Sequence, residues 1–169
     1  MVDGNIQDFI NLGITPEVIG EGVNLYTYQD EHYVWFAYDY PNDSYGTLDL
    51  KIISPNEPDT VNLHVSAQLG EWYLNEGSPK PENSTSELWW NHKGWTANEV
   101  WMNGMDQSDV TPRPNFKSGA AREIQLSKKR FGRGEWKINM NIRMLKGADG
   151  EMFSVDYPSN DAMLTIQAN

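Results

Sequence analysis

The chain has 169 residues, of which 24 are acidic and 13 basic, giving a formal net charge of −11, and it contains no cysteine. An acidic chain gains nothing by releasing counterions from a polyanion, which argues against DNA or RNA as a partner. The lack of cysteine excludes disulfides and thiolate-bound zinc. No apolar run approaches the ~20 residues of a membrane span, so we expect no membrane insertion. The length suits a single domain over residues 1–169.

Several segments alternate strictly between apolar and polar residues, and this period of two predicts β-strands with one buried face. They cover residues 48–52, 61–69, 124–126, 137–144 and 164–166. Residues 33–38 are apolar on both faces instead. They predict a central strand, either covered on both sides or presenting aromatic rings to a ligand on its second face.

Turn residues separate these segments, and helical periodicity is scarce. One helical turn is expected at residues 15–19, with Thr15 as its N-cap and Pro16 at its first position. The longest irregular stretch, residues 75–86, predicts a surface loop. The pattern as a whole predicts an all-β fold, an antiparallel, jelly-roll-like sandwich of two sheets with little helix. Its expected core is Val34, Phe36, Leu48, Leu50, Leu63, Val65, Ile138, Met140 and Ile142.

Charge is unevenly distributed along the chain. Residues 1–85 hold 14 acids and 2 bases, whereas residues 86–169 hold 10 acids and 11 bases. The bases gather between residues 122 and 146. Such a cluster could form a local face for an anionic polymer, although a solvated turn that balances acids elsewhere is the more common outcome.

Four of the seven tryptophans lie between residues 89 and 101, among polar residues rather than aliphatic ones. Indole rings beside short hydrogen-bonding groups suit a sugar, whose C–H faces stack on aromatic rings while its hydroxyls need donors and acceptors. The alternative is that these rings are simply core, and we expect some buried and some exposed. The candidate binding residues are Trp89, Trp90, Asn91, His92, Lys93, Trp95, Asn98, Glu99 and Trp101.

Three finer expectations concern this stretch. If Trp89 and Trp90 lie on a strand, one ring is core and the other exposed, because neighbouring side chains point to opposite faces. Trp101 is the expected exposed ring, since its neighbours Val100 and Met102 look like core residues. Lys93 would favour an acidic or sulfated sugar.

The polar faces of two predicted strands offer a second set of hydrogen-bonding groups. Amides and guanidinium groups on a sheet face can bind sugar hydroxyls or carboxylates, although such groups are more often simply solvated. The set comprises His64, Ser66, Gln68, Asn139, Asn141 and Arg143.

The opening of the chain, residues 2–9, resembles the start of family 9 carbohydrate-binding modules and their DOMON-like relatives. Residues 23–39 look like the first hairpin of that family, with a strand, an acidic turn and an aromatic strand in order. The similarity covers about the first forty residues. It implies a β-sandwich that binds a polysaccharide or oligosaccharide, as part of a larger protein that is secreted or on the cell surface.

The same resemblance implies bound groups. Family 9 modules often hold structural calcium, an ion that takes several carboxylate and carbonyl oxygens. With the acid excess of the first half, this suggests calcium at turns near Asp3, Asp39 or Asp156. Some DOMON-like members bind haem through Met and His, and this chain has three histidines (His32, His64, His92) and seven methionines.

The expected function is therefore that of a non-catalytic carbohydrate-binding module. The alternatives are a small polysaccharide lyase or glycoside hydrolase domain, or a haem-binding domain. A hydrolase could pair Glu87 with Glu99, and a lyase could use His64 or His92 with a tyrosine. The sequence has no nucleophile elbow, phosphate-binding glycine loop or His-Glu-x-x-His zinc motif.

Overall fold

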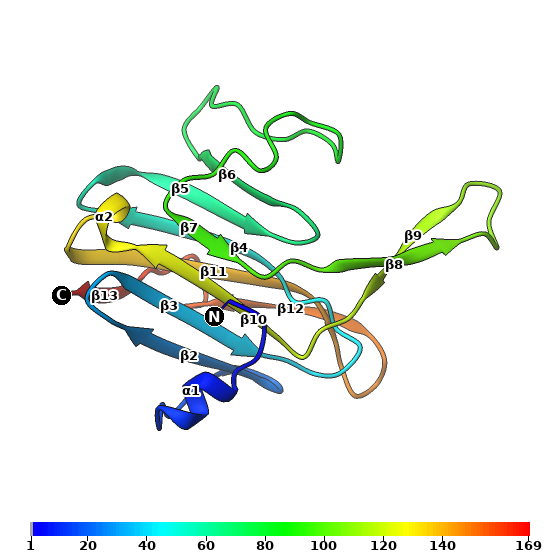
Figure 1. Cartoon of the computed structure of the whole chain (residues 1–169), viewed down its shortest axis with the longest axis horizontal. Helices are drawn as coiled ribbons and strands as arrows, with labels where there is room; N and C mark the ends of the chain where they lie inside the picture. The colour runs from blue at the N-terminus through cyan, green and yellow to red at the C-terminus, as the bar shows by residue number, and fades with distance from the viewer. Residues whose placement is uncertain (1) are drawn as a thin grey trace.

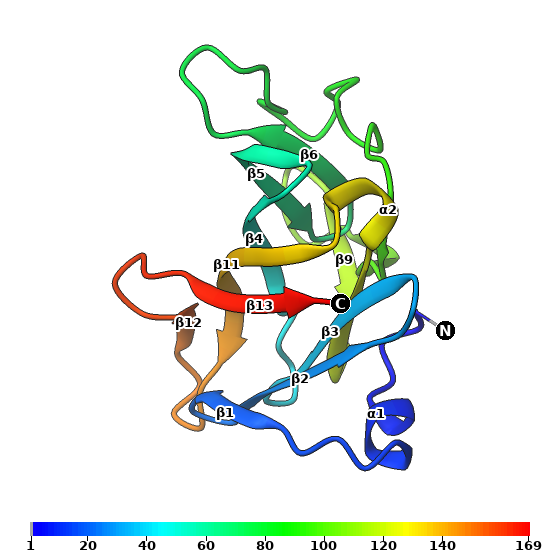
Figure 2. The ribbon, with the colours of Figure 1, turned by 90° about the vertical axis from the view of Figure 1, so that its left-hand side faces the viewer.

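A computed structural model describes residues 2–169 and shows two antiparallel sheets packed face to face (Figure 2), which confirms the predicted all-β sandwich. The first sheet has the order β1-β2-β3-β10-β7, and the second has β12-β11-β4-β5-β6, with β13 also pairing with β11. A separate pair, β8 and β9, projects from the sandwich as a hairpin (Figure 1).

The strands are β1 (Glu17–Gly20), β2 (Val23–Gln29), β3 (Tyr33–Asp39), β4 (Thr47–Ser54), β5 (Glu57–Val65), β6 (Leu69–Tyr73), β7 (Trp95–Ala97), β8 (Trp101–Asp106), β9 (Arg113–Lys117), β10 (Ala121–Ser127), β11 (Gly134–Lys146), β12 (Met152–Tyr157) and β13 (Leu164–Ala168). Two short helices complete the fold, α1 (Gln7–Asn11) and α2 (Lys128–Phe131).

The core lies between the two sheets and contains every residue predicted for it. All nine side chains are at most 1% exposed, because the apolar positions of the alternating strands face inward. Phe36 and Ile124 come from the first sheet, whereas Leu50 and Met140 come from the second. The sequence period and the packing therefore agree.

Strand β3 is the central strand that its sequence predicted, since it lies between β2 and β10. Its second face does not present free aromatic rings to a ligand. Instead, α1 covers that face, and Phe9 forms a small second core with Tyr26 and Ala37, against which Trp35 packs. Of the two alternatives for this strand, the covered one is observed.

The predicted helical turn at residues 15–19 is wrong. Glu17 and Val18 belong to β1, which pairs with β2 along the edge of the first sheet. Strand pairing satisfies the backbone groups that a single helical turn leaves without partners. The other short helix, α1, lies upstream, where its one buried residue, Phe9, anchors it. No helix within residues 2–169 has the length and apolarity needed to cross a membrane.

The basic cluster of residues 122–146 is divided between exposed and buried side chains: Lys129, Arg133, Lys137 and Arg143 are exposed, whereas Arg122 and Lys128 are buried. The ammonium group of Lys128 is buried and donates hydrogen bonds to Gln29 Oε1 and to the carbonyls of Asp30 and Asn169, at 2.6–2.8 Å. Arg133 also donates to the Asn169 carbonyl. These hydrogen bonds join Lys128 of α2 and the nearby Arg133 to the β2–β3 turn and to the last residue of the chain.

Residues 74–94 connect β6 to β7 and rise beyond the edge of the second sheet (Figure 1). The predicted loop at 75–86 is confirmed as mostly exposed and irregular. The segment then returns to the sheet, where the Trp90 amide donates to the Leu69 carbonyl at 2.8 Å. Gln68 Nε2 also reaches the Ser84 carbonyl at 3.0 Å. The loop is thus attached along the edge of β6.

Candidate functional site

A cavity of ≈ 530 Å³ lies beside β6, bounded by the 78–94 segment and by α2. We call it the arginine pocket, after the side chain at its centre. Aromatic and charged groups converge on it, which is the usual composition of a site for a small polar ligand. Its lining consists of Glu57, Val61, Glu71, Trp72, Tyr73, Ser78, Pro79, Leu88, Asn91, Lys93, Gly94 and Arg130.

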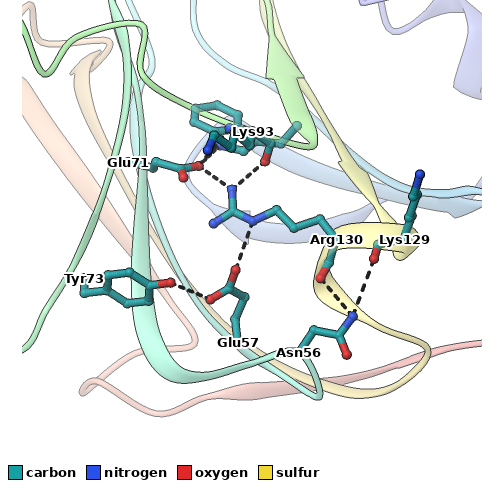
Figure 3. Close-up of polar contacts among 8 residues, drawn as sticks. Asn56, Glu57, Glu71, Tyr73, Lys93, Lys129 and Arg130 are labelled. Carbon is teal, nitrogen blue, oxygen red and sulfur yellow. Dashed lines mark hydrogen bonds and ion pairs between the residues drawn. The ribbon is translucent and has the colours of Figure 1, made fainter.

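Arg130 joins two glutamates in this pocket (Figure 3). Its Nε donates to Glu57 Oε1 at 3.1 Å, and its Nη1 donates to Glu71 Oε2 and to the Lys93 carbonyl. Both glutamate side chains are only 15–17% exposed. Burial alone would lower the pKa of Arg130, but the two carboxylates outweigh it and the pKa is raised. The guanidinium is therefore a permanent cation.

Strand register brings the acidic partners together. Leu63 lies opposite Glu71 and Val61 lies opposite Tyr73, so Glu71 and Tyr73 share the core-facing side of the sheet edge. Glu57 begins β5, where it lies opposite Ser54 of β4. At this edge the polar groups can reach α2 across the gap between the sheets.

Gly94 allows Arg130 to approach. It has φ +68°, and a Cβ built there would lie 2.7 Å from Arg130 Cβ. Any other residue would therefore be strained by its backbone conformation and would also push the stem of Arg130 away. The Ser127 amide donates to the Gly94 carbonyl at 2.8 Å, which fixes α2 beside this turn.

Further hydrogen bonds hold Glu71 Oε2, the oxygen that already accepts from Arg130, and Glu57 Oε2. Glu71 Oε2 accepts hydrogen bonds from Trp95 Nε1 at 2.6 Å and from the Lys93 amide at 3.3 Å. The Tyr73 hydroxyl donates to Glu57 Oε2 at 2.8 Å. This hydrogen bond is the main reason why the pKa of Tyr73 is raised. The hydrogen bonds of the network are thus all made by the chain itself, without a ligand.

Two polar atoms of the network have no hydrogen-bond partner among residues 2–169. Arg130 Nη2 donates to none of them, and Glu71 Oε1 accepts from none. Neither atom is a buried, unsatisfied one, and Figure 3 shows Nη2 turned toward the space beside Tyr73 and Glu71. The pocket thus offers a free donor and a free acceptor whose positions are already fixed.

Trp72 connects the arginine pocket to a second group of side chains on the outer face of the same sheet. Its ring lies 5.9 Å from that of His64 and 6.4 Å from that of Trp89, and the last two rings are 5.4 Å apart. We call these three residues the histidine cluster. Gly70 makes room for it, since a Cβ there would meet the Trp89 ring at 2.8 Å.

Asp49 holds His64 in place. Its Oδ1 lies 2.8 Å from His64 Nδ1 and accepts from Asn62 Nδ2 at 2.9 Å, while its Oδ2 pairs with Arg143. Burial would raise the pKa of Asp49, but the hydrogen bonds from His64 and Asn62 and the charge of Arg143 outweigh it and lower the pKa. Two polar strand faces singled out from the sequence, those of β5 and β11, therefore meet on this outer face through β4.

The nine candidate residues of the tryptophan-rich stretch are spread over four places. Asn91 and Lys93 line the arginine pocket, and Trp95 is buried beside it. His92 packs its ring 4.6 Å from that of Trp95. The other five residues lie elsewhere.

Trp89 and Trp90 lie in a turn rather than on a strand, so the expected alternation of faces does not apply. Trp89 belongs to the histidine cluster, and the exposed Trp90 has φ +65°. A backbone in that conformation cannot continue a strand.

Trp101, Asn98 and Glu99 line a second cavity of ≈ 310 Å³ at the base of the β8–β9 hairpin. Trp101 is 72% exposed, as predicted. The reason given for that prediction is wrong in part, because Met102 is 65% exposed instead of core. The hairpin has left the sandwich, so both of its faces meet solvent.

The three aspartates suggested for calcium do not form a common set of ligands. Asp39, on the first sheet, accepts hydrogen bonds from the amide and side chain of Asn24. Asp156, on the second sheet, accepts a hydrogen bond from its neighbour Asn141. Asp3 Oδ1 accepts from the Asn5 amide. Among residues 2–169, no three His, Asp or Glu side chains are grouped to hold a metal. Calcium stays a prediction that comes from the resemblance.

Comparisons of the chain with protein-family models, with curated proteins and with solved structures found no match.

Proposed function

We propose that the chain is a carbohydrate-binding domain and that the arginine pocket holds the sugar of a polysaccharide or oligosaccharide. The observation that carries this proposal is the pair of free polar atoms, Arg130 Nη2 and Glu71 Oε1, held by the fold in a pocket that Tyr73 also lines. A secreted or cell-surface location in a larger protein belongs to the same proposal, on the strength of the family resemblance.

Sugars match this arrangement chemically. A hydroxyl can donate to Glu71 Oε1 while it or its neighbour accepts from Arg130 Nη2, and hydrogen bonds to charged groups contribute about 1.5–3 kcal/mol each. The ring of Tyr73 is 42% exposed at the rim and can cover a sugar face. Such apolar burial adds about 25 cal/mol per Å².

The pocket suits binding better than hydrolysis. Glycoside hydrolysis needs one carboxyl group to give a proton to the leaving group. Glu57 and Glu71 both accept hydrogen bonds from the same guanidinium, which is the bonding pattern of two carboxylates. The pair suggested from the sequence, Glu87 and Glu99, is divided between an exposed turn and the cavity at the hairpin base.

Lys93 bears on the kind of sugar. It lines the pocket, and its side chain is not among the groups that bind the two glutamates. An ammonium group at the rim would favour a carboxylate- or sulfate-bearing sugar over its neutral counterpart. Matched pairs of neutral and acidic oligosaccharides test this point directly.

The test is isothermal titration against a panel of such pairs. Tyr73→Ala should weaken binding at least tenfold, because it removes both the ring and the donor to Glu57. The control is Trp90→Ala, which truncates an exposed aromatic ring outside the pocket, 51% exposed against 42% for Tyr73. Absence of binding across a broad panel, or equal affinity of the two variants, would overturn the proposal.

Two measurements on the same samples address the alternatives. New reducing ends or unsaturated products after incubation with the panel would indicate a hydrolase or a lyase. A Soret band on protein reconstituted with haem would indicate a haem-binding domain.

A further inference from the structure

The β8–β9 hairpin is the one large element outside the sandwich in the described part of the chain, and it extends away from it (Figure 1). Every residue from 101 to 117 is exposed. An isolated two-stranded hairpin is marginally stable in water, and it normally needs packing on one face. No residue within 2–169 supplies that packing.

The register gives the hairpin two different faces. Met102 lies opposite Phe116 and Met105 lies opposite Pro114, so these four side chains share one face. A bulge at residues 103–104 separates the two pairs, and Gly104 there has φ +79°. Without the extra residue, Met105 would point to the other face.

The opposite face is mainly polar. It carries the cross-strand pairs Trp101 with Lys117 and Asp106 with Arg113. The bulge therefore produces an apolar face backed by a charged one, which is the pattern of a half-buried sheet. Large exposed apolar patches on a soluble protein indicate an interaction surface.

Charge indicates what kind of partner can approach. The chain carries −11, but the hairpin itself is neutral, with two acids (Asp106, Asp109) and two bases (Arg113, Lys117). Its base holds Lys117, and its tip holds both acids with Arg113. The two ends therefore differ in net charge, so an antiparallel copy of the hairpin avoids bringing ends of like charge together, while Asp106, Arg113 and Lys117 stay on the faces turned away from the contact.

We propose that the apolar face binds the same face of a second copy of this chain, with the two hairpins packed antiparallel about a two-fold axis. A two-fold contact needs a self-complementary surface, which the paired Met and Phe side chains supply. Two negatively charged copies of the chain can associate through their neutral hairpins, because the acidic sandwiches then remain apart. A contact of this size is smaller than a standard interface of about 800 Å² per partner, so the dimer should be reversible. This proposal is independent of the sugar site.

Sedimentation velocity from low micromolar to near-millimolar concentration tests the proposal. The wild type should show a monomer–dimer equilibrium, and Met102→Gln with Phe116→Gln should weaken it at least tenfold. Trp101→Gln, on the opposite face, is the control and should dimerise like the wild type. A wild type that stays monomeric throughout, or a double variant that dimerises equally well, would overturn the proposal.

A second experiment tests which face of the hairpin forms the contact. It uses engineered cysteines, because the chain has no native cysteine. Met105→Cys places one thiol on the apolar face, and mild oxidation should yield disulfide-linked dimers. Asp106→Cys places a thiol one residue further, on the polar face, and should yield few. Equal cross-linking of the two variants would contradict the proposed packing, as would wild-type monomers that sediment with anionic or neutral lipid vesicles.

Discussion

The arginine pocket and the β8–β9 hairpin differ in which kind of side chain they keep from water. In the pocket, charged groups are nearly buried and each is held by several partners: Arg130 by two glutamates and a carbonyl, and Glu71 by three donors. On the hairpin, large apolar groups are exposed and no described residue covers them. The pocket buries charged groups, which water would stabilise, whereas the hairpin exposes apolar groups, whose contact with water is unfavourable.

This contrast shows how each region is tied to function. Buried charges persist only where the fold supplies their hydrogen bonds, so the pocket must be rigid in the free protein. An exposed apolar face gains its stability only when a partner removes it from water. Variants in the pocket should therefore cost stability, and variants on the hairpin should leave the stability of the monomer almost unchanged.

The largest expected effect is that of Arg130→Met. The change leaves Glu57 and Glu71 close together and without their cation, and loss of one partner from a buried pair costs about 3 kcal/mol or more. Urea denaturation measures this directly. Arg113→Met is the matched control, because its only ion pair within residues 2–169 joins two exposed side chains of the hairpin and should contribute less than about 1 kcal/mol. Equal losses in the two variants would remove the distinction between the regions.

The next effect concerns Asp49 and depends on pH. Because the folded-state pKa of Asp49 is lowered, its contribution is fully present above the unfolded pKa of about 4 and is lost as pH falls further. Asp49→Asn should cost about 1.5–3 kcal/mol near neutral pH, since hydrogen bonds to a charged group are lost. The difference from wild type should shrink below about pH 4. A difference that stays constant down to pH 3 would contradict the lowered pKa.

A smaller effect is expected for Gly70→Ala. The added methyl group would lie 2.8–2.9 Å from ring atoms of Trp89, so the ring must move, at about 1–2 kcal/mol. The shift should change the tryptophan fluorescence spectrum. In a background with Trp89→Leu the same substitution should cost much less. Equal costs in both backgrounds would mean that the Trp89 ring is not the obstacle.

The smallest effect is that of Trp101→Ala, because its ring is 72% exposed on the charged face of the hairpin. The free energy of unfolding should change by less than about 0.5 kcal/mol. A loss above about 2 kcal/mol, measured by thermal and urea unfolding, would mean that the hairpin packs against the sandwich in solution.

The sandwich could be predicted from the sequence because the alternation of apolar and polar residues along a strand is visible in the sequence itself. Leu48, Leu63 and Met140 needed no knowledge of the neighbouring strands to be placed inside. The same rule failed for Met102, since alternation cannot reveal that a hairpin has left the core. For the tryptophans, the expected split is seen, with Trp95 buried and Trp101 exposed.

The pocket could not be predicted in this way. Glu57, Glu71 and Tyr73 meet only through the register of β5 with β6, and Arg130 joins them from α2 on the far side of the sandwich edge. The one sequence signal was the cluster of bases between residues 122 and 146, which includes Arg130 and is more commonly a solvated turn. Hydrogen bonds between side chains of different strands and helices depend on the tertiary structure, and the spacing of residues in the sequence does not reveal them.

The central claim, that a glycan binds in the arginine pocket, is tested most directly by the indole N–H signals of the seven tryptophans in a ¹H–¹⁵N NMR titration with the best glycan of the panel. Trp95 Nε1 donates to Glu71, and Trp72 lines the pocket, so these two indoles report on its occupancy. We predict saturable shifts at Trp72 and Trp95, with Trp101 unchanged. Shifts confined to Trp101, or none at a saturating glycan concentration, would contradict the account.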